Sequence, residues 1–548
     1  MVVKGLSRIA MGVVAAVVGA AGLSACGTAS NQKTTAAPLV VLPSPIGSYS
    51  RNFNPFSPTD LPGTTGLVYQ DLFYFNPLKN QTYPMLGTSF TWSGHGTVLT
   101  VNLRKKVKWT NGQPFNAADV VYTFELLKRY PALDTNGIWK VLKDVKAVNS
   151  YVVTFTFKSP NVPYQWYVLG ETPIVDQTVW KNVANPVKYS NPNPVGMGPY
   201  SLKSFSPQVY AFNANASYWG GRPQVPTVEY PAYTSNSSAD LALSRGKIDW
   251  SGLFIPNAQK IYVKPNPNQN HYWFPPNYIV ILYTNLKNPL LAKKPVREAM
   301  SLAIDREKID KVGEYGYENP SSPTALVLPN NKAWLSPNLP AHDVSFSYNP
   351  TKAVTILKNA GFKKNAQGIF TSPSGKPLSF TLNVVSSATD WVSDASIMQS
   401  ELQNVGIKLT VNQEQYGAFY GALKSGTYQL AIWGSSSGPT PYYLYNALLS
   451  PSSAGNYEHW NSSATNTALA QYSASSNPSV QKDAMYKIEE IMATQLPSIP
   501  LVNGPNWYEY NTSQYSGWPT VSNPYATPTP ASTFGTAVVL MHLHPVTK

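Results

Sequence analysis

Residues 378–411 read LSFTLNVVSSATDWVSDASIMQSELQNVGIKLTV, and this stretch decides the class of the fold. Apolar and polar side chains alternate over 378–384 and again over 407–411, which predicts two strands. Residues 393–405 between them predict a helix that ends at Gly406. A strand, a helix and a strand in succession normally build a parallel sheet through a right-handed crossover. The fold class is therefore α/β.

Elements on either side of this unit agree with that class and add antiparallel strands. Residues 97–103 and 151–157 alternate as strands do, and residues 116–119 predict a helix cap with an acid in the first turn. Asn349 begins another helix, for which Gly361 is the stop. Pro-rich stretches, which we interpret as linkers, separate the elements; they are 185–199, 264–276 and 519–530.

The amino terminus predicts export. Lys4 and Arg8 precede an apolar run of about 14 residues, shorter than the roughly 20 that cross a bilayer as a helix. The residues that end in Cys26 resemble the bacterial lipobox, which implies a signal peptide over 1–25 and lipidation of Cys26. The alternative is an ordinary secretory signal with a chance cysteine. Residues 26–37 are small and polar, as in a flexible tether.

Composition excludes several function classes. Cys26 is the only cysteine of the 548 residues, so disulfides and cysteine catalysis are excluded from the mature chain. The formal net charge of +14 arises from only 27 Asp and Glu against 41 Lys and Arg, without long basic clusters, and does not favour a nucleic-acid partner. Few carboxylates would also suit acidic surroundings, which we hold as a hypothesis.

Catalytic and metal-binding motifs are weak. Residues 434–438 match the G-x-S-x-G pattern, but Pro439 and Pro441 follow, where a nucleophile elbow needs a helix, so a secreted serine hydrolase is a distant alternative to a Ser-rich loop. The sequence holds no P-loop and no H-E-x-x-H motif. A strand through His542 and His544 would place both on one face, but an ordinary terminal strand is the simpler interpretation. We therefore expect neither an enzyme, nor a metal site, nor a cofactor.

Seven motifs in register carry a resemblance to a known family. They are 53–56 (FNPF), 99–127 with WTNGQPF at 109–115, 194–200 (PVGMGPY), 215–223, 296–306, 349–362 and 496–501. Together they resemble the bacterial extracellular solute-binding proteins of family 5, the peptide, nickel and oligosaccharide binding lipoproteins of ATP-binding-cassette (ABC) importers.

The resemblance implies a two-lobed fold of the periplasmic-binding-protein type II kind, with an extra small domain. Carried onto this chain, lobe I takes 38–62, 190–284 and 500–548, the small domain 63–189, and lobe II 285–499. Two crossing segments, near 283–285 and 499–501, would form the hinge that closes the lobes over a ligand.

Candidate ligand contacts follow from the resemblance and from rigid aromatic or amide side chains near the crossings, although each could instead pack in the core. They are Asn54, Trp273, Tyr416, Trp433, Ser436, Tyr442 and Asn446. Peptide binders of the family usually carry an Asp shortly after the Trp, which pairs with the peptide's amino group. The matching position here is Ser436, and residues 427–454 contain no acid. Glu414 could replace that anchor, or the neutral cleft could suit an oligosaccharide.

The expected function is solute capture. We expect a monomeric lipoprotein on the outer face of the cytoplasmic membrane that binds an oligopeptide-class ligand and delivers it to ABC permease subunits. An oligosaccharide is the alternative ligand, and nickel or another solute is a third.

Overall fold

The structure is a computed structural model that describes residues 37–435 and 438–546. The predicted signal peptide, Cys26 and nearly all of the tether lie outside the described residues, as does Ser436. Among the helices that are described, none combines the length and the apolar character that a membrane crossing requires.

The first sheet has seven strands and draws on widely separated parts of the chain. Its order is β12 (Asn270–Tyr272), β20 (Glu509–Asn511), β11 (Trp250–Ser251), β1 (Leu39–Leu42), β10 (Thr227–Pro231), β9 (Val209–Ala214) and β8 (Tyr200–Phe205). Strand β1 pairs in parallel with both β10 and β11, and the outer pairs are antiparallel. Its centre is therefore built by the first strand of the described chain.

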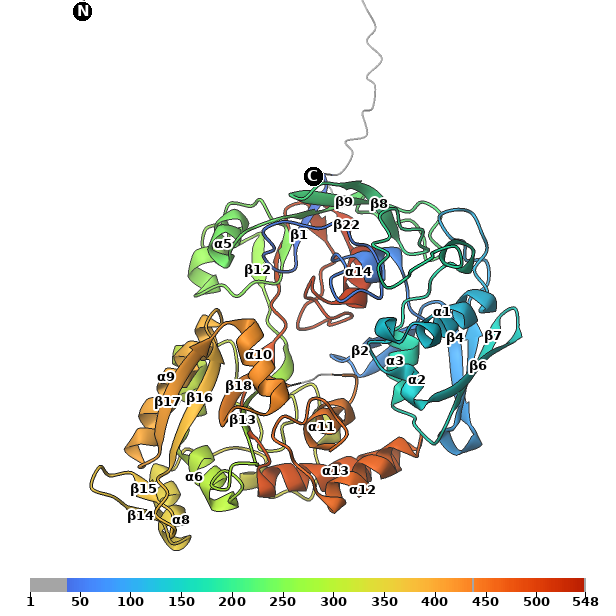
Figure 1. The fold of residues 1–548 in the computed structure, drawn as a ribbon. Helices are drawn as coiled ribbons and strands as arrows, with labels where there is room; N and C mark the ends of the chain where they lie inside the picture. Colours follow the sequence, from blue (N-terminus) through green and yellow to red (C-terminus); the bar gives the residue numbers. More distant parts are fainter. Residues whose placement is uncertain (1–36, 436–437, 547–548) are drawn as a thin grey trace, which may run out of the picture. The chain divides into compact units, whose positions relative to one another are not determined.

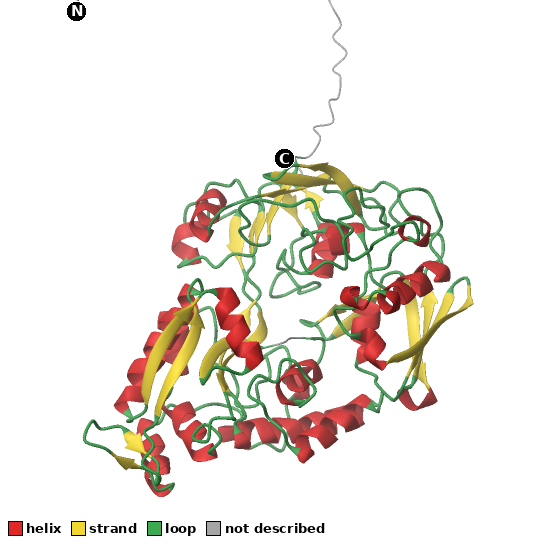
Figure 2. Ribbon diagram, viewed as in Figure 1, coloured by secondary structure: helices red, strands yellow, loops and turns green. Residues whose placement is uncertain are grey.

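An antiparallel sheet of four strands carries helix α1 (Ala117–Arg129). Its order is β4 (Gly87–Ser93), β5 (Val98–Leu103), β7 (Val152–Phe157) and β6 (Leu142–Asn149). Helix α1 lies against this sheet (Figure 2), and its Phe124 ring contacts the ring of Phe155 on β7. The predicted helix cap is confirmed. The Asn116 side chain accepts from the Ala118 N–H at 2.8 Å, and the Asp119 carboxylate accepts from the Asn116 N–H at 3.0 Å.

The five-stranded sheet contains the strand–helix–strand unit from which the fold class was predicted. Its order is β17 (Lys408–Glu414), β16 (Ser379–Val385), β18 (Leu430–Gly434), β13 (Pro276–Thr284) and β19 (Ile499–Pro505). Strands β16 and β17 pair in parallel over their whole length, and α9 (Thr389–Asn404) lies along them (Figure 1). The α/β prediction is confirmed.

The two predicted crossing segments lie in neighbouring strands. Strands β13 and β19 pair antiparallel, with Leu282 opposite Ile499 and Val280 opposite Val502. On its other edge β13 pairs with β18. The division of the chain into lobes stays a prediction, because residues 36–548 form one compact unit.

The remaining elements are helices and short hairpins. The helices are α2 (Ile138–Val141), α3 (Tyr164–Gly170), α4 (Gln177–Trp180), α5 (Asn236–Ser244), α6 (Lys294–Ala303), α7 (Arg306–Lys308), α8 (Pro350–Asn359), α10 (Tyr416–Ser425), α11 (Pro441–Leu449), α12 (Ser463–Ser473), α13 (Pro478–Gln495) and α14 (Thr533–His542). The hairpin strands are β2 (Phe73–Asn76) with β3 (Gln81–Pro84), β14 (Lys363–Lys364) with β15 (Phe370–Thr371), and β21 (Tyr515–Ser516) with β22 (His544–Pro545). Helix α8 begins at the predicted cap, where Asn349 accepts from the Lys352 N–H at 2.9 Å.

The 194–200 motif has a packing role. The N–H groups of Met197 and Gly198 both donate to the Val68 carbonyl, at 3.1 and 2.9 Å. A Cβ at Gly196 would overlap that carbonyl oxygen, and one at Gly198 would overlap the carbonyl of Leu67. Both positions therefore need glycine because two stretches of main chain meet there.

Two predictions are wrong. His542 ends helix α14 and His544 begins β22, so the pair does not lie on one strand. Two of the three stretches interpreted as linkers are not simple linkers, because residues 526–530 are buried and 264–276 contains β12, which pairs with β20.

Candidate ligand-binding site

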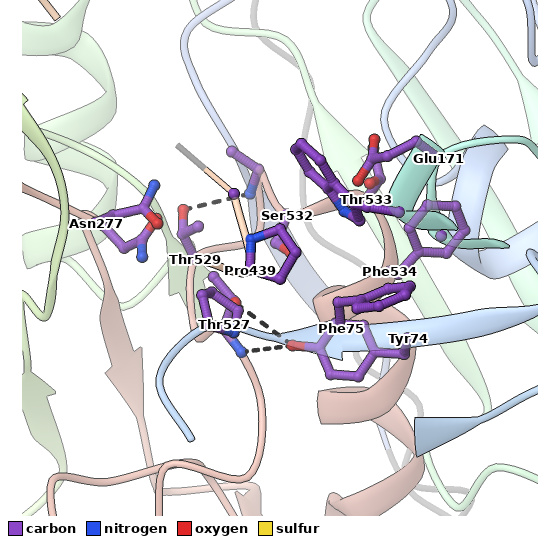
Figure 3. Close-up of a pocket in the computed structure, with 16 residues that line it drawn as sticks. Tyr74, Phe75, Glu171, Asn277, Pro439, Thr527, Thr529, Ser532, Thr533 and Phe534 are labelled. Carbon is purple, nitrogen blue, oxygen red and sulfur yellow. Dashed lines mark hydrogen bonds between the residues drawn. The ribbon is translucent and has the colours of Figure 1, made fainter. Parts of the chain in front are cut away.

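A cavity of about 320 Å³ is lined by segments from across the chain (Figure 3). Its walls are Tyr74, Phe75, Pro77, Trp166, Gly170, Glu171, Asn277, Gly438, Pro439, Asn506, Thr527, Thr529, Ala531, Ser532, Thr533 and Phe534. In the view of Figure 3, Asn277 and Glu171 lie on opposite sides. The volume falls within the range of about 300–1,000 Å³ that is typical of small-molecule sites.

Hydrogen bonds hold one wall of the cavity together. The Tyr74 hydroxyl, on β2, accepts from the Thr527 N–H at 2.9 Å and contacts the Thr527 hydroxyl at 3.4 Å (Figure 3). Asn76, at the end of β2, donates to the Pro524 carbonyl at 3.0 Å. The buried segment before α14 is thus fixed against β2.

The opposite wall is tied to the central strands. The Ile279 N–H of β13 donates to the Ser435 hydroxyl at 2.9 Å, and the Ser435 N–H donates back to the Ile279 carbonyl at 2.8 Å. Ser435 follows β18, and Gly438 and Pro439 further along the same loop line the cavity.

The lining combines neutral polar groups with aromatic rings, and Glu171 is the one charged residue among those that line the cavity. Asn506 is only 7% exposed, and its Nδ2 has no hydrogen-bond partner among the described residues. A buried amide without a partner costs free energy, so a ligand acceptor placed there would be stabilised.

Glu171 lies beside a second acid. Burial raises the pKa of Glu171 to about 7, and hydrogen bonding by Trp166 opposes the rise. Asp71 is 0% exposed, and both of its carboxyl oxygens lack a partner among the described residues. Burial, and then repulsion from Glu171, raise the pKa of Asp71 well above its usual value. A smaller cavity of about 200 Å³ also borders Glu171.

A cluster of aromatic rings, the aromatic platform, surrounds Trp433 at the end of β18. Its members are Trp391, Tyr416, Phe419, Tyr420 and Trp433, and the other four rings have centroids 5.5 to 6.0 Å from that of Trp433. Tyr416 is 54% exposed and stacks on Tyr420. The structure thus brings together two of the predicted contact residues, Tyr416 and Trp433.

The other predicted contact residues lie elsewhere. Asn54 is 1% exposed, and its amide is committed to main-chain groups, donating to the carbonyls of Pro186 and Tyr189. Trp273 is half-buried against Tyr508. Tyr442 is buried, stacks on Tyr472 at 4.5 Å and hydrogen-bonds to Ser473. Asn446, half-buried, lies one turn further along α11. Neither these four residues nor Tyr416 and Trp433 line the cavity, and the ligand roles of all six stay predictions.

Glu414, the alternative anchor, is already engaged. Its two carboxylate oxygens accept from the side-chain amides of Asn383 and Asn412, at 2.9 and 3.0 Å. Within the described part of the chain, no three His, Cys, Asp or Glu side chains are grouped so that they could hold a metal ion.

Sequence reasoning missed most of the cavity. Thr527 and Thr529 lie in the stretch interpreted as a linker, and Asn506 and Glu171 stand in no motif that distinguishes them from other polar residues. The Pro-Thr-Pro run at 528–530 gave no signal of burial, because Pro and Thr are mostly exposed in proteins.

Comparison with known proteins identifies the class. Bacterial extracellular solute-binding proteins, family 5 Middle, match residues 81–456. The oligopeptide-binding protein AppA of Bacillus subtilis (strain 168) is 28% identical over 371 residues, which cover 64% of this chain and 65% of AppA. The match thus spans slightly less than two thirds of that relative.

Two solved structures of a periplasmic oligopeptide-binding protein from Thermotoga maritima share the fold. The first has a TM-score of 0.86 and 27% identity, and the match covers 93% of this chain and 99% of the Thermotoga chain. The second, with mannohexaose bound, has a TM-score of 0.79 and 27% identity, and the match covers 93% of this chain and 98% of the Thermotoga chain.

The fold is the one that these solved periplasmic solute-binding proteins share. More specifically, the chain belongs to the bacterial extracellular solute-binding proteins of family 5.

Proposed function

We propose that this chain is the capture component of an ABC importer. It binds an oligopeptide-class solute outside the cytoplasm and delivers it to the permease subunits. The observation that carries the proposal is the cavity itself, where β2, α3, β13, the loop after β18 and the segment before α14 converge.

The peptide assignment is supported by the lining and by the relatives. Side-chain amides and hydroxyls such as those of Asn277, Asn506 and Thr529 can pair with the alternating donors and acceptors of a peptide main chain. AppA and the Thermotoga protein are both named for oligopeptide binding.

An oligosaccharide is the second candidate. The Thermotoga protein also holds mannohexaose, and a cavity walled mainly by neutral polar and aromatic side chains suits a sugar as well as a peptide. The aromatic platform could stack on a pyranose ring in the same way as on an apolar side chain.

The lipid anchor belongs to the same proposal. A signal peptide over 1–25 and acylation of Cys26 would hold the protein on the outer face of the cytoplasmic membrane as a monomer. The residues from 26 to the start of β1 would then set its reach from the membrane.

The test is a ligand screen with a cavity variant. Native mass spectrometry of the protein lacking residues 1–26, followed by thermal shift with oligopeptide and manno-oligosaccharide sets, identifies the ligand class. Asn506→Ala removes a side chain that has no hydrogen bond to described residues, so we expect intact folding and a loss of affinity of roughly 2- to 10-fold.

Asn404→Ala is the matched control, because Asn404 is exposed at the end of α9. Equal affinity of wild type and Asn506→Ala for the identified ligand would place the ligand outside this cavity. Absence of binding to every peptide and sugar would overturn the capture function.

A further inference from the structure

The cavity has an acidic end that lacks a counter-ion. Glu171 lines the cavity and Asp71 lies behind it, in the residues that lead into β2. Helix α3 ends at Gly170 and packs against β2, so the ends of these two elements bring the acids together.

No cation in the described residues compensates this pair. None of the ion pairs found there includes Glu171 or Asp71. Neither of the two cavities that border Glu171 is lined by Lys or Arg. The titratable groups that face Glu171 are acids and phenols, namely Asp71, Tyr74, Asp134, Tyr167 and Tyr443.

The fully buried Asp71 carboxyl has no partner among the described residues, and a second acid beside it makes its ionised form still less stable. Such a site gains most from a positively charged group that enters the cavity and donates hydrogen bonds to the Glu171 carboxylate. The empty volume next to Glu171 provides the room for that group.

We propose that Glu171, with Asp71 as a positioning residue behind it, forms a subsite for the cationic group of the solute, an ammonium such as a peptide's free amino terminus. This inference rests on the proposed capture of a peptide and names its anchor. The acid that pairs with the peptide's amino group would then lie on the wall formed by α3 and β2. The loop after Trp433 cannot supply it, because residues 427–454 contain no acid.

The subsite makes binding depend on pH. Glu171, with a pKa of about 7 in the empty cavity, must ionise to pair with an ammonium, so affinity rises with pH and a proton is released below that value. If only the ionised form binds, affinity falls roughly 20-fold from pH 7.5 to pH 5.5. A neutral sugar that hydrogen-bonds to Glu171 would not show this dependence.

The experiment uses a pool of short peptides with free amino termini and the same pool N-acetylated. Native mass spectrometry of the protein picks out binders, and calorimetry then compares one retained peptide with its acetylated twin at pH 5.5 and 7.5. We expect the free form to bind roughly 10- to 100-fold more tightly at pH 7.5, as for a charge-assisted contact.

Two variants locate the anchor. Glu171→Gln should remove both the preference for the free amino group and the pH dependence, while Glu171→Asp retains part of each. Glu414→Gln is the matched control and should leave both unchanged, because the Glu414 oxygens already accept from two asparagines. Thermal unfolding of each variant reports whether it folds.

The outcomes separate the two proposals. Equal binding of free and acetylated peptides overturns the subsite and leaves peptide capture intact. The same holds if Glu414→Gln, and not Glu171→Gln, removes the preference. Retention of mannohexaose but no peptide overturns the subsite and changes the solute class, and retention of neither overturns both proposals.

Discussion

Glu489 provides a quantitative test of the buried carboxyls in this protein. It lies on α13, is 0% exposed, and accepts from the Ser336 N–H at 2.8 Å through Oε2. Its Oε1 is buried and has no partner among the described residues. Burial raises the pKa of Glu489 to about 8. The perturbation is Glu489→Gln, which keeps the shape of the side chain and removes its ionisation.

The sign and size of the effect follow from the two pKa values. A carboxyl with a raised pKa in the folded state is most stabilising below its unfolded value, and that contribution is lost as pH rises toward the folded value. Between pH 5 and pH 8, with 4.5 for the unfolded chain and about 8 for the folded one, the wild type loses about 3 kcal/mol at this residue. The Glu489→Gln variant has no ionisable group at this position and does not lose this stability.

Thermal unfolding at the two pH values isolates the loss of stability that comes from ionisation of Glu489. The Gln amide can still accept from the Ser336 N–H, and the cost of placing an N–H₂ at Oε1 is the same at both pH values. With an unfolding entropy of roughly 2 cal/mol/K per residue, about 3 kcal/mol becomes about 3 °C for a chain of this size. We therefore expect the Tm difference, variant minus wild type, to be about 3 °C more positive at pH 8.

The control is Glu490→Gln, one residue further along the same helix and exposed to solvent. A Tm difference for Glu489→Gln that is the same at both pH values would refute the reasoning, as would an equal response from the control. Glu458 and Glu509 have pKa values that burial likewise raises to about 8. Confirmation at Glu489 would thus support the hypothesis that the protein suits acidic surroundings.

Three further predictions test other parts of the molecule. Trp433→Ala removes the centre of the aromatic platform and should weaken ligand binding about tenfold in calorimetry; unchanged affinity would separate the platform from the site. Gly196→Ala should lower stability by about 2 kcal/mol or more, because its Cβ meets the Val68 carbonyl, whereas Gly417→Ala, in open space on α10, should be neutral or slightly stabilising; equal Tm values for the two variants would contradict this. Cys26→Ser should move the protein from the membrane fraction to the soluble fraction on fractionation, and an unchanged distribution would rule out the anchor.

Local patterns predicted much of the fold. The cap at Asn116 and the strands on either side of α9 follow from interactions within a few residues, which a sequence displays directly. The error at His542 has a physical reason as well. Residues 537–543 are apolar except for His542, and a short run of this kind does not distinguish a buried helix from a strand.

The site could be predicted only in small part. Tyr416 lies on α10 and Trp433 on β18, the next element along the chain. Their rings are in contact, and the short separation in sequence made this contact easier to predict. Glu171, Asn506 and Thr527 meet only because distant segments converge, and no periodicity in the sequence records that meeting. Tyr442, an aromatic residue of the same appearance as Tyr416, packs on Tyr472 in the interior instead.

The seven-stranded sheet also sets the order of events during synthesis. Strand β1 is complete when the chain has barely begun, yet β20, which closes the sheet beside β11, comes only at residues 509–511. The Tyr515 hydroxyl donates to the Ala37 carbonyl across 478 residues of chain, and contacts of such long range slow folding. A growing chain therefore cannot finish this sheet until it is nearly complete, and it stays open for longer than a protein with local contacts. Such a delay would suit a chain that crosses a membrane before it folds, as the amino-terminal export signal predicts.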